Sequence, residues 1–329
     1  MKLKYKLLIS LFVGLVVIIA IYHYFSPLEL FRHINLYSFK FIPMYLVISF
    51  LIMGCLVIRW QNILACFGQP VKFWKLFEYK LAGFAISYLT PTMHIGGEPV
   101  RAYLLKNHDI ALPKAISSVL LDDAIEFSVD VVFGIIGFLL IITHYAISGK
   151  ATALILGALL VSFFIIGRFF YMHSKGKGSF SATVEFFRLH KFKGIRAVIE
   201  KIKLIEENTI FILRWKKGPF LKSFAIAIVL WVLMFFEYYF ALRIIGYTPN
   251  MMEIFLVMSL VALAYVVPVP AALGVLEAAQ ISIFLFLGIQ VYLAIALTFL
   301  IRTRDLIWTL IGLIFVYKHS RPVLRKMFR

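Results

Sequence analysis

Two stretches of this chain interrupt membrane-length hydrophobic sequence with helix-breaking and ionisable residues. The first runs from Pro91 to Arg101 and reads PTMHIGGEPVR, and the second runs from Pro268 to Glu277 and reads PVPAALGVLE. A backbone group left unpaired in lipid is costly, so such breaks persist only where protein covers them or where they line a wet cavity. Paired Gly- and Pro-interrupted segments in the two halves of a membrane protein indicate a transporter binding site. The two breaks therefore predict a membrane transporter.

The composition and the apolar runs place the chain among polytopic helical membrane proteins. Of 329 residues, 62% are hydrophobic and 33 are Phe, which is incompatible with a soluble domain of this size. Apolar runs of about eighteen residues or more recur along the sequence, as transmembrane helices require. The first run ends at Phe25 with no small-residue cleavage site after it, so we expect it to be retained as a span. Cys55 and Cys66 fit no metal-ligand spacing and predict no disulfide.

The excess of basic residues has the distribution of a membrane protein and not of a nucleic-acid binder. The formal net charge is +18, with eleven Lys/Arg against four acids between His173 and Gly218 and five more basic residues between Lys318 and Arg329. Basic residues gather in cytoplasmic loops, where anionic lipids attract them. We therefore expect a cell-membrane protein with both termini cytoplasmic, membrane lipids including anionic inner-leaflet lipids as partners, and no nucleic acid.

We expect an all-α polytopic membrane protein with one transmembrane domain over residues 1–329. It would have about six full spans plus two oppositely oriented broken or re-entrant hairpins, at about 76–112 and 253–289. Hairpins that enter from opposite faces would fit an inverted repeat with a site near the midplane. The alternative divides each hairpin into two thin spans, for about eight to ten helices in all. The expected spans are 7–25, 41–59, 117–145, 151–172, 219–242 and 291–317.

The basic cytoplasmic loop at about 173–218 contains a helical pattern. Five apolar residues between Ile195 and Ile205 recur at helical spacing, opposite basic residues between Lys193 and Lys203. This pattern predicts an amphipathic basic helix on the inner membrane surface. A solvated connector is the alternative interpretation.

Ionisable residues at membrane depth cost about 2.5–3.5 kcal/mol each on insertion scales, so we take those near the breaks as candidates for a substrate path. Glu98 and Arg101 are three residues apart and are expected to share a helical face, as are Arg302 and Asp305. The complete set of candidates is Gly96, Gly97, Glu98, Arg101, Asp122, Asp123, Glu126, Asp130, Pro268, Pro270, Gly274, Glu277, Arg302, Arg304 and Asp305.

Internal neutralisation is the alternative for these charges, with Glu98–Arg101 and Arg302–Asp305 as structural pairs. Glu237 stands in an aromatic run and is expected at the membrane interface. The motifs of zinc proteases, serine hydrolases and phosphate-binding loops are missing from the sequence. We therefore expect no catalytic residues, no metal and no cofactor.

These residues resemble the flippase-like membrane family to which the N-terminal part of lysylphosphatidylglycerol synthase (multiple peptide resistance factor) belongs. The match covers nearly the whole chain. Its most specific parts are the run from Gly96 to Ala102, the acidic residues near Asp122, and the run from Pro268 to Glu277. The resemblance implies movement of polar-headed lipids between leaflets, often of aminoacylated or glycosylated lipids.

The chain departs from the family pattern at two places. The family usually has Glu-Arg where Asp122-Asp123 stand, so a basic partner is missing there. It usually has two glycines where Ala271-Ala272 stand, which leaves less room for a close backbone approach. The aminoacyl-transferase domain of the fused synthases does not follow the last span, so no lipid synthesis is expected.

The interpretation that we favour is a lipid flippase or scramblase for phospho- or glycolipids. Arg101, Arg302 and Arg304 would contact phosphate, because arginine offers planar bidentate donors. One alternative is a membrane enzyme or accessory subunit acting on a lipid-linked substrate, and another is a small-solute permease. A homo-oligomer and a separate lipid-synthesising enzyme are further partners to consider.

Overall fold

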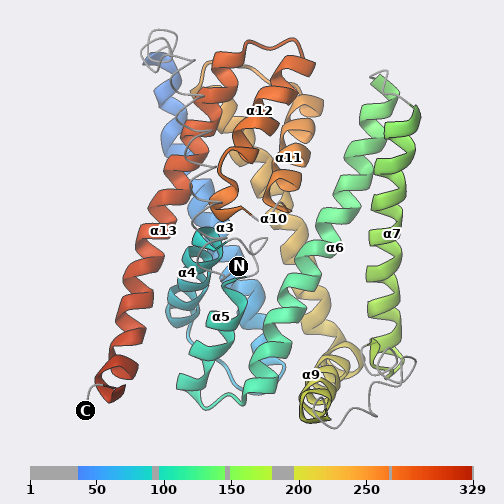
Figure 1. Cartoon of the computed structure of the whole chain (residues 1–329), viewed down its shortest axis with the longest axis vertical. Coiled ribbons are helices and arrows are strands. Elements are labelled where there is room, and N and C mark those ends of the chain that lie inside the picture. The colour runs from blue at the N-terminus through green and yellow to red at the C-terminus, as the bar shows by residue number, and fades with distance from the viewer. Residues whose placement is uncertain (1–35, 91–95, 145–148, 180–195, 267–268, 328–329) are drawn as a thin grey trace, which may run out of the picture. The chain divides into compact units, whose positions relative to one another are not determined.

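The computed structural model describes residues 36–90, 96–144, 149–179, 196–266 and 269–327 (Figure 1). Every regular element in these residues is a helix, which confirms the all-α polytopic membrane fold. The α-helices are α3 (Ile42–Ala65), α4 (Phe73–Leu89), α5 (Glu98–Leu104), α6 (Leu112–His144), α7 (Gly149–Ser174), α9 (Arg196–Trp215), α10 (Lys217–Ile244), α11 (Met251–Val266), α12 (Val275–Phe286) and α13 (Val291–Met327). The 3-10 helices are η1 (Leu36–Phe41), η2 (Leu105–His108) and η5 (Pro270–Ala272).

Four helices in the described residues are long and apolar enough to cross a membrane. They are Phe39–Ala65, Leu112–Thr143, Thr152–Ser174 and Lys217–Ile244, at the places expected for four of the spans. The expected span 291–317 lies within the 37-residue helix α13, which carries two arginines and an aspartate near its middle. The expected span 7–25 lies outside the described residues. The total number of spans and the inverted repeat stay predictions.

In both of the segments expected to form hairpins, the helices are interrupted at the Gly- and Pro-containing runs. In the first, α4 ends at Leu89 and α5 begins at Glu98. In the second, α11 ends at Val266 and α12 begins only at Val275, with the short helix η5 between them. The reason is local, because proline cannot donate the helix hydrogen bond and glycine favours turns.

The described chain divides into two compact units. Unit one is drawn from residues 1–53, 78–100 and 232–329, and unit two from residues 54–77 and 101–231. In unit one, α12 packs against both α11 and α13 (Figure 1). This packing places the second break beside α13.

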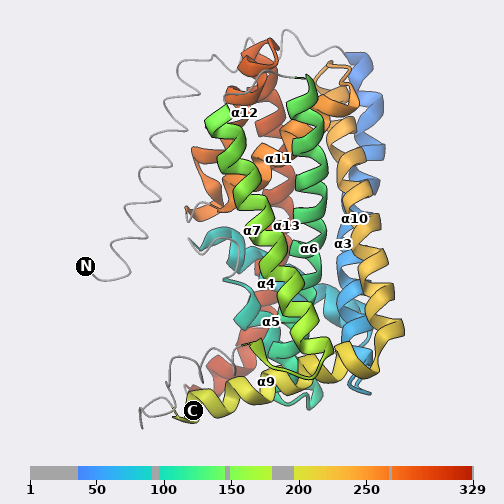
Figure 2. The same cartoon turned by 90° about the vertical axis from the view of Figure 1, so that its right-hand side faces the viewer.

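Unit two is built around α6, which packs against α7 and α9 (Figure 2). Its core includes Ile63, Leu121, Ile125 and Ile212, which are at most 1% exposed. The apolar side of α9 contributes to this core, so an amphipathic helix forms in the predicted loop from Arg196 onward, and its expected place on the inner membrane surface stays a prediction. Its buried contacts with α6 and α7 exclude the solvated-connector interpretation.

Gly97 in unit one lies against α4 at a distance that only glycine allows. Its backbone N–H donates a hydrogen bond to Ser87 Oγ at 2.8 Å. A Cβ atom on Gly97 would overlap the carbonyl oxygen of Gly83, which is backbone and cannot rotate away. The break in the first hairpin therefore depends on a glycine at this position.

We predict that Gly97→Ala destabilises the protein by about 1–3 kcal/mol, because overpacking forces the backbone of α4 to shift. Gly54→Ala is the matched control, since nothing lies within 4 Å of a Cβ at that position on α3. Alanine there should be neutral or stabilise the helix by up to about 1 kcal/mol. Thermal unfolding of the purified variants measures both, and equal melting temperatures for the two would contradict the prediction.

Candidate functional site

The backbone of the second break adopts conformations that favour glycine, although alanines occupy two of its positions. Ala271 has φ +52° and Ala272 has φ +48°, and Gly274 has φ +79°. A left-handed backbone brings the Cβ atom of an L-residue close to the following carbonyl oxygen. The glycines usual in the resembled family at the two alanine positions would remove this crowding. The alanines therefore keep the turn only because other contacts hold it.

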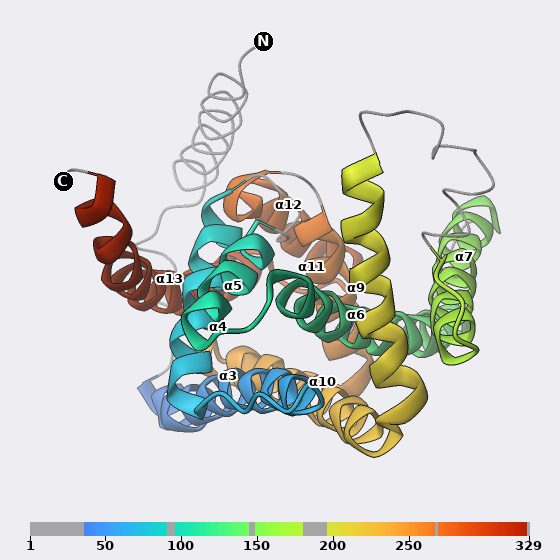
Figure 3. The same cartoon turned by 90° about the horizontal axis from the view of Figure 1, so that it is seen from below.

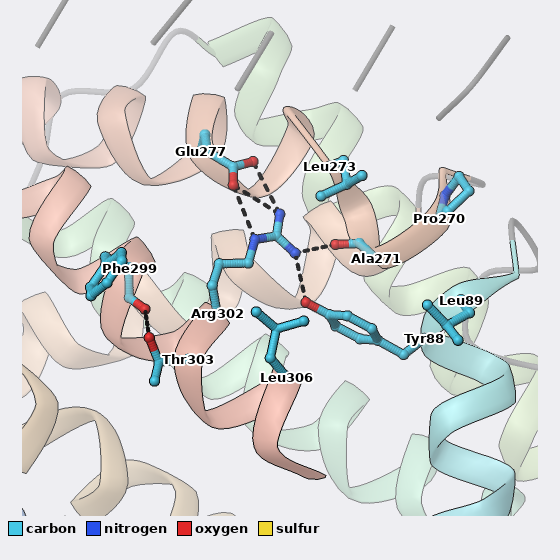
Figure 4. A pocket seen from close by; sticks show the side chains of 10 residues that line it. All are labelled: Tyr88, Leu89, Pro270, Ala271, Leu273, Glu277, Phe299, Arg302, Thr303 and Leu306. Atoms are coloured by element: carbon cyan, nitrogen blue, oxygen red, sulfur yellow. Dashed lines mark hydrogen bonds and ion pairs between the residues drawn. The ribbon is translucent and has the colours of Figure 1, made fainter. Parts of the chain in front are cut away.

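Arg302 on α13 supplies those contacts (Figure 4). Its Nη1 donates to the carbonyl oxygen of Ala271 and to Tyr88 Oη at 3.2 Å, and its Nη2 donates to the carbonyl oxygen of Ala272 at 3.1 Å. Nε and Nη2 also donate to the Glu277 carboxylate at 3.0–3.1 Å. Each nitrogen of this buried guanidinium thus has an acceptor.

Glu277 connects the same arginine to the start of α12. Its Oε2 accepts a hydrogen bond from the Gly274 backbone N–H at 2.7 Å, in the arrangement of a capping box. Glu277 is 3% exposed, and its charge is offset by Arg302. The pair therefore satisfies backbone groups on both sides of the break.

A pocket of about 410 Å³ opens beside this network, within unit one (Figure 4). The volume falls within the range of about 300–1,000 Å³ that is usual for small-molecule sites. Most of its wall is apolar, and the ion pair, the Tyr88 hydroxyl and Thr303 supply the polar groups. The lining residues are Tyr88, Leu89, Pro270, Ala271, Leu273, Glu277, Phe299, Arg302, Thr303 and Leu306.

A second ionic cluster of unit one is centred on Arg304, two residues after Arg302 on α13. Arg304 binds Glu237 at 2.5 Å through Nη1 and Asp305 at 2.8 Å through Nη2. Glu237 is only 4% exposed. An arginine partner thus allows the carboxylate to be buried within the protein, and its expected place at the membrane interface stays a prediction.

Unit two contains an ionic network centred on Asp122. Its Oδ1 accepts from Arg59 Nε at 2.7 Å and its Oδ2 accepts from Arg101 Nη2 at 2.6 Å. The side chains of Asp122 and Arg59 are at most 1% exposed. The Arg101 guanidinium also lies 4.5 Å from the centre of the Trp60 ring, a cation–π contact.

Two further acids extend this network toward the surface. Asp123 binds Arg101 at 3.0 Å, and Glu126 binds Arg59. Both acidic side chains are 36% exposed. The cation that the sequence lacks next to Asp122 is thus supplied from other helices.

The structure brings the predicted residues together in combinations that differ from those expected by spacing. Arg101 binds Asp122 and Asp123, and Arg302 binds Glu277. Asp305 pairs with the adjacent Arg304.

Other predicted positions lie apart from these pairs. Gly96 lies in the turn before α5, which begins at Glu98. Asp130 is exposed on α6, and Pro268 lies outside the described residues. No group of three or more potential metal ligands occurs in the described part of the chain.

Arg59, the last residue of the expected span 41–59, is not among the site residues predicted from the sequence. However, the apolar sequence continues past it to Ala65, and α3 does so too. An arginine inside a continuing apolar helix is the signal that indicates a buried partner.

The chain matches the family model of the lysylphosphatidylglycerol synthase TM region over residues 6–312. The chain belongs to this family. It is 27% identical to a UPF0104 membrane protein of Pyrococcus horikoshii over 80% of the chain and 82% of that protein. It is 23% identical to a UPF0104 membrane protein of Methanothermobacter thermautotrophicus over 90% of each. No solved structure matches it.

We predict that Asp122→Asn destabilises this family member by about 3–5 kcal/mol, because two buried arginines lose their shared charge partner. Glu126→Gln is the matched control, since Glu126 binds the same Arg59 with a side chain that is 36% exposed. Its cost should be about 1 kcal/mol or less, as for exposed ion pairs. Unfolding in mixed micelles measures both variants, and equal losses would show that Asp122 is not the centre of the network.

Proposed function

We propose that this membrane protein moves polar-headed phospholipids or glycolipids between leaflets, as a flippase or scramblase. The observation that carries the proposal is the pocket beside the second break, where an apolar wall meets a buried ion pair and a tyrosine hydroxyl. A lipid combines the same two kinds of surface, since its headgroup needs polar partners and its chains need apolar ones. Family membership supports the same class of function.

Arg302 is the residue that we infer to exchange partners during transport. Its nitrogens are occupied by the Ala271 and Ala272 carbonyls, Tyr88 and Glu277. A phosphate oxygen is a stronger acceptor for a guanidinium than a backbone carbonyl, because the hydrogen bond is charge-assisted. A headgroup that replaced the carbonyls would release the left-handed turn. Binding would thereby favour a second conformation of the break.

The carboxylates of unit two argue against the alternative of a membrane enzyme. Asp122 and Glu126, one helical turn apart on α6, would be the acid–base or metal-binding pair of such an enzyme. Both bind Arg59, and Asp122 binds Arg101 as well. Carboxylates neutralised in this way hold helices together more readily than they transfer protons. Membership in a transmembrane-region family also supports a role without catalysis.

We predict that filling the pocket blocks transport without disturbing the ion pair. Leu306→Trp adds bulk to a lining position, whereas Leu310→Trp adds the same bulk one turn further along α13, outside the pocket. Both leucines are more than half exposed, so neither change should unfold the protein. We expect Leu306→Trp to slow transport about tenfold or more, which is a barrier of about 1.4 kcal/mol or higher.

The measurement is the transbilayer movement of labelled lipids in reconstituted vesicles, with several phospholipid and glycolipid headgroups. Leu310→Trp should retain the wild-type rate. Equal rates for the two variants would place the path elsewhere. Failure of the wild-type protein to move any of the lipids would overturn the proposed function itself.

We also predict that the double substitution Glu277→Gln and Arg302→Met abolishes transport while the helices stay folded, although the turn at Ala271 and Ala272 loses its support from Arg302. Replacing both members of a buried pair with uncharged side chains of similar volume is often neutral for stability, whereas removing one member costs about 3–5 kcal/mol. Melting temperature and transport rate should be measured on the same preparation. A well-folded double variant with normal transport would mean that the pair is only structural.

A further inference from the structure

A surface of unit two combines exposed aromatic rings with basic side chains. Each of three aromatic residues, one on α7 and two on α9, has a cation near its ring. Lys175 lies 5.9 Å from the ring centre of Tyr171, Arg214 lies 5.1 Å from that of Trp215, and Lys216 lies 6.0 Å from that of Phe211. We call these six residues the aromatic–basic surface.

Its aromatic residues are not covered by the unit to which they belong. Tyr171 is 65% exposed, Phe211 is 40% exposed and Trp215 is 67% exposed. Phe211 and Trp215 continue a stripe that starts at Leu204, because spacings of seven and four residues fall on one helical face. The opposite face of α9, which includes Leu213, is buried in the core of unit two. An apolar stripe of this kind requires a partner.

The contacts of α9 place this surface near the end of a span. Figures 2 and 3 show α9 crossing the direction of α6 and α7. Ser117 Oγ, in the second turn of α6, donates to the carbonyl oxygen of Ile205 at 2.9 Å. The 33 residues of α6 extend over about 50 Å at 1.5 Å per residue. That length exceeds the hydrocarbon thickness of about 30 Å, so its first turns reach the headgroup layer.

We propose that the aromatic–basic surface binds the anionic headgroups of the surrounding leaflet. Aromatic rings favour the membrane–water interface, and basic side chains are attracted to anionic lipids. Lys177 and Lys217 are also exposed beside it, and Gly176, with φ +79°, brings the loop after α7 next to Arg214. The exposed acids on α9 are only Glu200 and Glu207 within the described residues. The charge therefore favours phosphatidylglycerol-like lipids over zwitterionic ones, through residues other than those that line the pocket.

The test uses the full chain in nanodiscs containing brominated phosphatidylglycerol or brominated phosphatidylcholine, which quench nearby tryptophan. The difference in quenching between the wild-type protein and Trp215→Phe isolates the signal of Trp215 from that of the other tryptophans. We expect stronger quenching of Trp215 by the anionic lipid, reduced by high salt because exposed charges are screened.

Two triple variants test the charges. Lys175→Gln, Arg214→Gln and Lys216→Gln together should lower the preference for the anionic lipid about tenfold or more. The control carries Lys72→Gln, Lys106→Gln and Lys150→Gln, which removes the same charge from exposed positions outside α9 and should keep the preference. All six side chains are exposed, and circular dichroism checks that both variants fold.

Three outcomes would overturn the proposal. The first is equal quenching of Trp215 by both lipids, and the second is an unchanged lipid preference in the first triple variant. The third is the absence of quenching of Trp215 by either lipid, which would assign the surface to a protein partner or to water. The comparison with Trp215→Phe decides the question even if a triple variant does not fold.

Discussion

The guanidinium of Arg302 is the group on which the broken segment of unit one depends. A helix that stops inside apolar surroundings leaves carbonyl and N–H groups without partners, and lipid offers none. Arg302 donates to two carbonyls of the turn, and its partner Glu277 accepts from the backbone N–H of Gly274. One neutral ion pair thus replaces the hydrogen bonds that the helix loses. The pocket owes its shape to this arrangement, because residues of the break and of α13 form its wall.

Unit two uses the same chemistry to bring helices together. Asp122 on α6 is held by Arg59 of α3 and Arg101 of α5, and Trp60 covers the Arg101 guanidinium. Desolvation often cancels the attraction of a buried ion pair, so apolar residues of equal volume would stabilise such a bundle at least as well. The charged network therefore favours a particular arrangement of helices more than it adds stability.

The features that could be predicted from the sequence are those that depend on neighbouring residues. Gly- and Pro-rich runs determine where α11 and α12 stop and start, and hydrophobic periodicity determines the amphipathic helix α9. Ion pairing could not be predicted in this way. Spacing favoured Arg101 with Glu98, but the arginine binds Asp122, 21 residues further on, and Arg302 binds Glu277, 25 residues back. Such partners are determined by how helices pack, which no short window of sequence contains.

The alanines of the second break are central to the proposed transport. Each left-handed alanine costs about 1–2 kcal/mol relative to glycine, and Ala271 and Ala272 both adopt this conformation. Hydrogen bonds to a charged group contribute about 1.5–3 kcal/mol each, so those from Arg302 slightly outweigh the strain. A headgroup that takes over the arginine removes this support, and the strain then favours release of the turn. With glycines at these two positions, the left-handed turn would carry no such strain, with or without Arg302. In the proposed mechanism the alanines thus link occupancy of the pocket to movement of the break, a link that the family's usual glycines would weaken.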